Sequence, residues 1–152
     1  MDILLMLRGF VSCSLACAFF AVMFRAPKKT VPVSAVTGGI GYVVYLVVIQ
    51  YMGLTAGFFF GTLAMSVLSE IFARIFKMPV TVFEMPAIVS LVPGAGIYSS
   101  MLYFVNNDNQ SGIAKTVETL MCAGAMALAI ASTSMVFRLM TSAADKKRSE
   151  PK

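Results

Sequence analysis

One stretch of the sequence, residues 83–98, gathers the residue types that could do chemistry in this chain. It contains, in order, Glu84, Ser90, Pro93, Gly94, Gly96 and Tyr98, in a run that is otherwise apolar. A carboxylate is costly to place in apolar surroundings, so Glu84 is a candidate for a functional role, either exchanging a proton or selecting a charged solute. Pro93 lacks a backbone N–H and the glycines permit non-helical angles. The stretch therefore predicts a helix broken at Pro93-Gly94.

The segment belongs to a chain that is apolar throughout. Of its 152 residues, 59% are hydrophobic and 12% are charged, whereas a soluble domain carries about 25% charged residues. A soluble fold of this size leaves much of its chain at the boundary with water and has nowhere to bury so much apolar surface. The composition therefore predicts a protein surrounded by membrane lipid.

Few residues suit catalysis or metal binding. The chain has no histidine, and Cys13, Cys17 and Cys122 lie inside apolar runs with too few neighbouring ligands for a metal site. The sequence contains no nucleotide-binding loop and no nucleophile–base motif. The net charge of +5 comes from short clusters at the ends of apolar runs, which disfavours nucleic-acid binding. We therefore predict no enzymatic activity, no metal and no cofactor.

Five apolar runs predict membrane-spanning helices, because about 20 helical residues cross the hydrocarbon. They cover residues 3–24, 32–51, 53–76, 79–105 and 119–137. The predicted fold class is all-α: a polytopic transmembrane module over residues 1–142, followed by a charged cytoplasmic tail over residues 143–152. Residues 106–112 predict a loop before the last helix. Pro93 lies about 14 residues, or about 21 Å, into the fourth run, which is well inside the hydrocarbon.

The basic residues indicate the orientation of the five helices. Ten of the 12 Lys and Arg residues follow the first, third or fifth run, and only Arg8 and Lys115 lie on the opposite side. Basic residues collect on the cytoplasmic side of membrane proteins. The pattern predicts five crossings with the N-terminus outside and the C-terminus inside. Lys115 and Glu118 are interpreted as helix-end residues at the outer membrane edge.

The broken fourth run has two interpretations. Unwound backbone at membrane depth is tolerated where it lines a cavity or is buried in protein, and transporters bind substrates at broken helices. In the first interpretation the six residues above lie on a substrate path. In the second, Pro93 is a kink packed against neighbouring helices, and Glu84 pairs near the interface with Lys77 or Arg74.

A glycine repeat predicts a packing face. Gly53, Gly57 and Gly61 recur at every fourth position, which places a smooth stripe along one helix face. Another backbone can approach such a face closely, either within the chain or between subunits.

Three stretches resemble the C-terminal module of the threonine/serine exporter family, which also exists as a separate small subunit. They are residues 24–32, residues 38–42 and residues 86–98, of which Val92-Pro93-Gly94-Ala95-Gly96-Ile97-Tyr98 is the most specific. The resemblance covers nearly the whole chain in order and length. It implies a subunit of a secondary exporter in a bacterial plasma membrane, driven by the proton motive force. The implied substrates are threonine and serine, or dicarboxylates such as succinate for the split bacterial pair. It also implies a larger membrane subunit as partner, because this chain carries only the small module.

Two other functions stay open at the level of sequence. The chain could be an assembly subunit that stabilises a partner without touching substrate. It could also form a homo-oligomeric channel in which the glycine stripe is the subunit contact.

Overall fold

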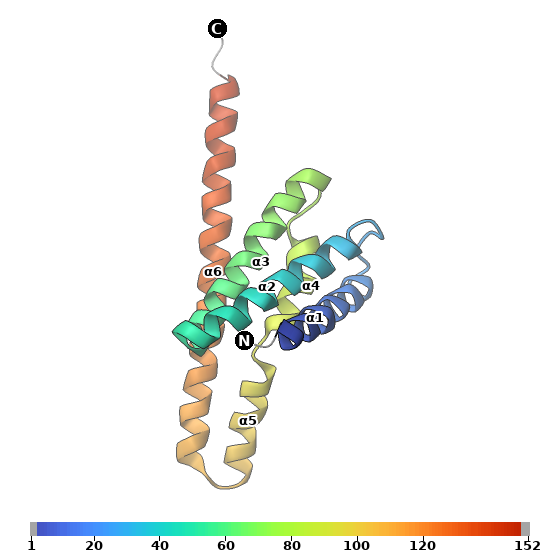
Figure 1. Ribbon diagram of the computed structural model, residues 1–152. Helices are drawn as coiled ribbons and strands as arrows, with labels where there is room; N and C mark the ends of the chain where they lie inside the picture. Colours follow the sequence, from blue (N-terminus) through green and yellow to red (C-terminus); the bar gives the residue numbers. More distant parts are fainter. Residues whose placement is uncertain (1–2, 150–152) are drawn as a thin grey trace.

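The chain folds into six helices (Figure 1). The computed structural model describes the backbone of residues 3–149 and the side chains of residue 4 and residues 6–140. The helices are α1 (Ile3–Met23), α2 (Val31–Met52), α3 (Leu54–Phe76), α4 (Thr81–Leu91), α5 (Gly94–Val105) and α6 (Asn109–Ser149). No strand occurs among the described residues, so the predicted all-α fold class is confirmed.

Five segments are long and apolar enough to cross a membrane, and α4 with α5 together form one of them. The segments cover residues 6–23, 31–52, 54–76, 81–105 and 109–140. This confirms the five predicted spans. The last helix exceeds the predicted run: α6 contains 41 residues, or about 61 Å, against about 30 Å of hydrocarbon. It continues without interruption across the predicted boundary between residues 142 and 143.

The predicted break in the fourth span is confirmed. Helix α4 ends at Leu91, and α5 begins at Gly94. A proline pushes the residue before it out of the helical region, and Val92 accordingly has φ −51° and ψ 131°. Pro93 itself, at φ −75° and ψ 55°, turns the chain before the helix resumes.

The helices pack in two parts that meet at α3. Helices α1, α2, α3 and α4 form one group, α6 lies along α3, and the backbone of α5 lies along α6 alone. Figure 1 shows α5 and the first turns of α6 as a hairpin that projects beyond the α2–α3 turn. A buried core joins α3, α4 and α6 next to the break; its members are Phe58, Met65, Ala87, Leu91, Cys122 and Met126.

The loop predicted over residues 106–112 is shorter in the structure, and the prediction was wrong for residues 109–112. Helix α6 begins at Asn109 because Asp108 caps it: the Ser111 N–H donates to Asp108 Oδ1 at 3.2 Å. Such a cap satisfies an N–H that the first helical turn leaves without a partner. Hydrogen bonds from the side chain and backbone of Ser111 hold the pKa of Asp108 below its usual value.

The glycine stripe is used inside the chain, between α2 and α3. A Cβ built on Gly61 would lie 2.9 Å from Tyr45 Cβ and 3.1 Å from the carbonyl oxygen of Gly41. Gly57 also faces α2, with a built Cβ 3.2 Å from the Tyr45 ring. Gly53 does not share this face. It forms the α2–α3 turn at φ +88°, with open space around it. Two of the three glycines are therefore occupied by a neighbouring helix of the same chain.

Candidate functional site

A cavity of ≈ 380 Å³ lies at the break between α4 and α5. This volume is within the range of small-molecule sites. Four of the six residues predicted to lie on a substrate path line it: Ser90, Pro93, Gly94 and Gly96. Helices α2, α3 and α6 supply further parts of its wall. The break in the fourth span thus opens into a cavity, as unwound backbone at membrane depth requires when it is not packed in protein.

One wall of the cavity is aromatic. Tyr42 and Tyr45 reach it from α2, and Phe58 reaches it from α3. The Tyr45 and Phe58 rings lie 4.9 Å apart between centroids at an interplanar angle of 53°. Tilted aromatic pairs at this spacing are favourable and hold their rings in place. This wall can therefore contact the apolar part of a small ligand.

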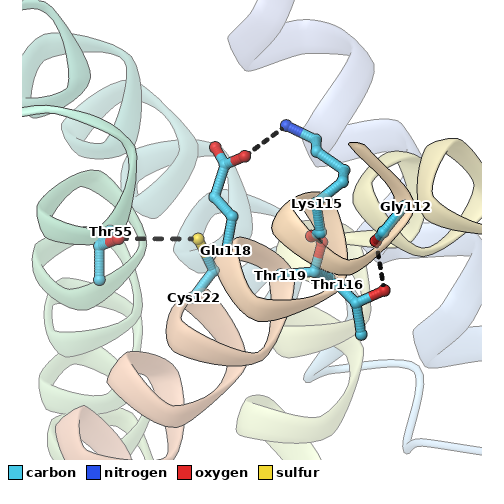
Figure 2. Close-up of polar contacts among 7 residues, drawn as sticks. All are labelled: Thr55, Gly112, Lys115, Thr116, Glu118, Thr119 and Cys122. Atoms are coloured by element: carbon cyan, nitrogen blue, oxygen red, sulfur yellow. Dashed lines mark hydrogen bonds and ion pairs between the residues drawn. The ribbon is translucent and has the colours of Figure 1, made fainter. Parts of the chain in front are cut away.

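A polar part of the lining belongs to one face of α6. Lys115, Glu118, Thr119 and Cys122 all line the cavity, because residues spaced by three, four and seven positions share a helix face. Lys115 Nζ lies 2.8 Å from Glu118 Oε2 (Figure 2). The Thr55 hydroxyl lies 4.0 Å from Cys122 Sγ, so α3 and α6 meet directly beneath this wall.

The interpretation of Lys115 and Glu118 as mere helix-end residues missed their place in the cavity. The available signal was the spacing of residues 115, 118, 119 and 122, which puts their side chains on one helix face. No local pattern indicates that this face meets the α4–α5 break, because that depends on how the α5–α6 hairpin folds back.

Gly96 sets the distance between α5 and α6 at the cavity. A Cβ built on Gly96 would lie 2.5 Å from Thr119 Oγ1 and 3.1 Å from its Cγ2. The Thr119 hydroxyl donates to the Lys115 carbonyl at 2.7 Å, which fixes the side chain in that position. A Cβ on Gly94, by contrast, would meet no atom within 4 Å.

Glu84 lies outside this cavity, toward the other end of α4. Its side chain is 8% exposed, and its Oε1 accepts a hydrogen bond from the buried Ser66 hydroxyl on α3. Of the two basic partners considered for it, Lys77 and Arg74, Arg74 donates to the Phe137 carbonyl at 3.0 Å and lies over the Phe137 ring at 4.8 Å. Ser66 thus supplies Glu84 with a hydrogen bond from a neutral hydroxyl.

A second cavity, of ≈ 910 Å³, lies beside Glu84 between α3, α4 and α6. Its lining includes Glu70, Arg74 and Arg138 as well as Glu84. On the α3 face toward α4, Thr62 and Ser69 are fully buried, and their hydroxyls have no partner among the described residues. Buried hydroxyls of this kind commonly bond to water. Four of the predicted path residues therefore line the first cavity, and Glu84 borders the second.

Tyr98 lies apart from both cavities. It is 69% exposed on α5 and lines neither of them. Ser90 lines the first cavity, but its hydroxyl donates to the Ala87 carbonyl at 2.6 Å within its own helix.

These features describe a multi-pass membrane protein with a cavity at a broken span and a buried acid nearby. The family described as "Threonine/Serine exporter, ThrE" matches residues 9–136. The chain therefore belongs to the threonine/serine exporter family, a family of transporters and not of enzymes. The match includes the α4–α5 break and the polar face of α6, and it confirms the resemblance found in the three sequence stretches. No curated protein and no solved structure matches the chain.

Proposed function

We propose that this chain is the small subunit of a secondary exporter that moves small amino acids or dicarboxylates across a bacterial plasma membrane. The observation that carries the proposal is the cavity at the α4–α5 break, in a chain of the exporter family. Transporters place substrate where a spanning helix is unwound, because freed backbone groups and half-helix ends can contact the solute there. The predicted orientation, with the N-terminus outside, puts the first turns of α6 on the outer side.

The proposed substrate path runs past Ser90, Pro93, Gly94 and Gly96. These residues line the cavity, and two of them lack side chains that would fill it. Tyr98 is left out of the proposed path because it is exposed on another side of α5.

Glu84 is the proposed coupling acid. It is buried and hydrogen-bonded to Ser66, and it borders a cavity large enough to hold water. An acid held within the membrane region can bind a proton on one side and release it on the other. Energy would then come from the proton motive force, in keeping with the absence of a nucleotide-binding motif in the sequence.

A larger membrane subunit of the same family is the proposed partner. The backbone of the α5–α6 hairpin lies along α3 alone, and the hairpin exposes large apolar side chains, among them Met101, Leu102, Leu120 and Met121. Either lipid or a second membrane subunit can cover such a surface. The alternative in which the chain forms a channel by itself is weakened, because Gly57 and Gly61 already face α2.

Transport by sealed vesicles tests the proposal. Vesicles with this chain alone, with the larger subunit alone and with both are loaded with radiolabelled serine, threonine or succinate, and efflux is followed with and without a pH gradient. We expect efflux only with both subunits, accelerated by the gradient. An assembled pair that moves none of the three solutes would contradict the proposal and favour an assembly subunit. Transport by this chain alone would favour a homo-oligomer.

A further inference from the structure

The ion pair on α6 stands in an unusual place. Lys115 and Glu118 are 33% and 43% exposed, and both border the first cavity, which the side chains of Tyr45 and Phe58 also line. Figure 2 shows the two side chains extending from the same face of α6 toward each other. Two full charges are thus held side by side at the rim of a cavity in an apolar protein.

Stabilisation of α6 does not account for the pair. An exposed ion pair adds little to stability. The order, with lysine before glutamate, is the less favourable one on a helix. Asp108 already caps this end of α6. Charged groups within a membrane protein ordinarily mark the path of a solute.

We propose that Lys115 and Glu118 recognise the zwitterionic head of an α-amino acid, a proposal that rests on the exporter function above. Lys115 Nζ would bind the ligand carboxylate, and the Glu118 carboxylate would bind its ammonium group. The pair has no net charge and neither does the ligand, so each charge exchanges its partner in the pair for one on the ligand. The two groups of an amino acid sit on one carbon, as close together as the two charges of the pair.

The same geometry disfavours a dicarboxylate. One carboxylate of succinate would bind Lys115, but the second would approach Glu118, where two like charges repel each other. A hydroxylated side chain would find the Thr119 side chain and the backbone of the α4–α5 break within the same cavity. The cavity therefore selects amino acids over dicarboxylates, with the specificity residing in Glu118.

Competition by analogues lacking one charge tests this assignment. Efflux of radiolabelled L-serine is measured in vesicles with both subunits, in the presence of one of three unlabelled competitors. They are L-serine, 3-hydroxypropionate, which lacks the ammonium group, and ethanolamine, which lacks the carboxylate. Glu118→Gln should weaken inhibition by L-serine and ethanolamine about tenfold or more, since a charge-assisted contact is lost, and leave 3-hydroxypropionate unchanged or stronger. Lys115→Gln should weaken inhibition by L-serine and by 3-hydroxypropionate and leave inhibition by ethanolamine unchanged.

Asp108→Asn is the matched control. It removes an acid from the same end of α6, outside the cavity, and asparagine caps a helix as well as aspartate does. The assignment would be overturned if Glu118→Gln and Lys115→Gln each weakened inhibition by all three compounds equally, or if neither changed inhibition by any of them. Misfolding is tested with the exchanged pair, Lys115→Glu with Glu118→Lys, which should assemble and still prefer L-serine to succinate. A parent complex that transports no serine at all would instead contradict the exporter function itself.

Discussion

Replacing Glu84 by glutamine is expected to abolish acceleration of efflux by a pH gradient, with at least a tenfold loss of the gradient-driven rate. Glutamine has nearly the same size as glutamate, and its amide oxygen can still accept the hydrogen bond from Ser66. The buried site is therefore preserved, but it can no longer bind and release a proton. Exchange of labelled for unlabelled serine across the membrane needs no net proton movement, so it should continue in the variant. Both rates are measured in the same vesicles.

Glu70→Gln is the comparison for this variant. Glu70 borders the same cavity but is less buried than Glu84, so we expect it to retain most of the gradient response. Equal dependence on the pH gradient in Glu84→Gln and the parent would exclude Glu84 as the coupling acid. Loss of exchange together with gradient-driven efflux would indicate a structural role.

Gly96→Ala is expected to reduce transport about tenfold and to destabilise the complex. Its Cβ would lie 2.5 Å from Thr119 Oγ1, and Thr119 is held by its hydrogen bond to the Lys115 carbonyl. Helix α5 must then move away from α6, which changes the cavity wall that carries the ion pair. Overpacking of this kind costs roughly 1–3 kcal/mol. The measurements are the efflux rate and the unfolding temperature in detergent.

Alanine substitutions at two other glycines distinguish a packing defect at the α5–α6 contact from a general effect of replacing glycine by alanine. Gly94 lies in the same turn of α5, but a Cβ at this position meets no atom within 4 Å. Gly94→Ala should therefore leave the unfolding temperature unchanged. Gly124→Ala on α6 also enters open space, away from both cavities, and should leave transport unchanged. A Gly96→Ala variant with the efflux rate and unfolding temperature of the parent would show that the α5–α6 contact does not shape the site.

The fold was accessible from sequence because each spanning helix must satisfy its own backbone and fill the hydrocarbon. The five apolar runs and the effect of Pro93 on Val92 are local properties, and the structure has them where the pattern indicates. The start of α6 was misplaced because polar residues suggested a loop, whereas Asp108 stabilises a helix end. Gly53 matched the spacing of the stripe but belongs to a turn.

The candidate site could be predicted only in part from the sequence, because it depends on which helix faces meet. The sequence places Glu84 nine residues, or about 13 Å of helix, before Pro93. That spacing does not predict that the two residues border different cavities. Lys115 and Glu118 reach the break through the packing of α6 against α3 and α5, which no local pattern in the sequence reports. Residues on a single segment were therefore predicted, and the wall supplied by another segment was not.

The most direct test of the central claim is substrate protection of a cysteine placed in the first cavity. Ser99 lines that cavity. Of the three native cysteines, all buried, Cys122 also lines it and is 1% exposed, so labelling of Ser99→Cys is measured against labelling of the parent. A membrane-impermeant thiol reagent is added outside vesicles that contain both subunits. We predict that L-serine at about ten times its Kd slows labelling about tenfold, because the occupied site excludes the reagent. Val105→Cys, exposed at the end of α5, should be labelled at a rate that serine does not change. Labelling of Ser99→Cys that proceeds at the same rate with and without a transported substrate would contradict the claim that substrate passes through this cavity.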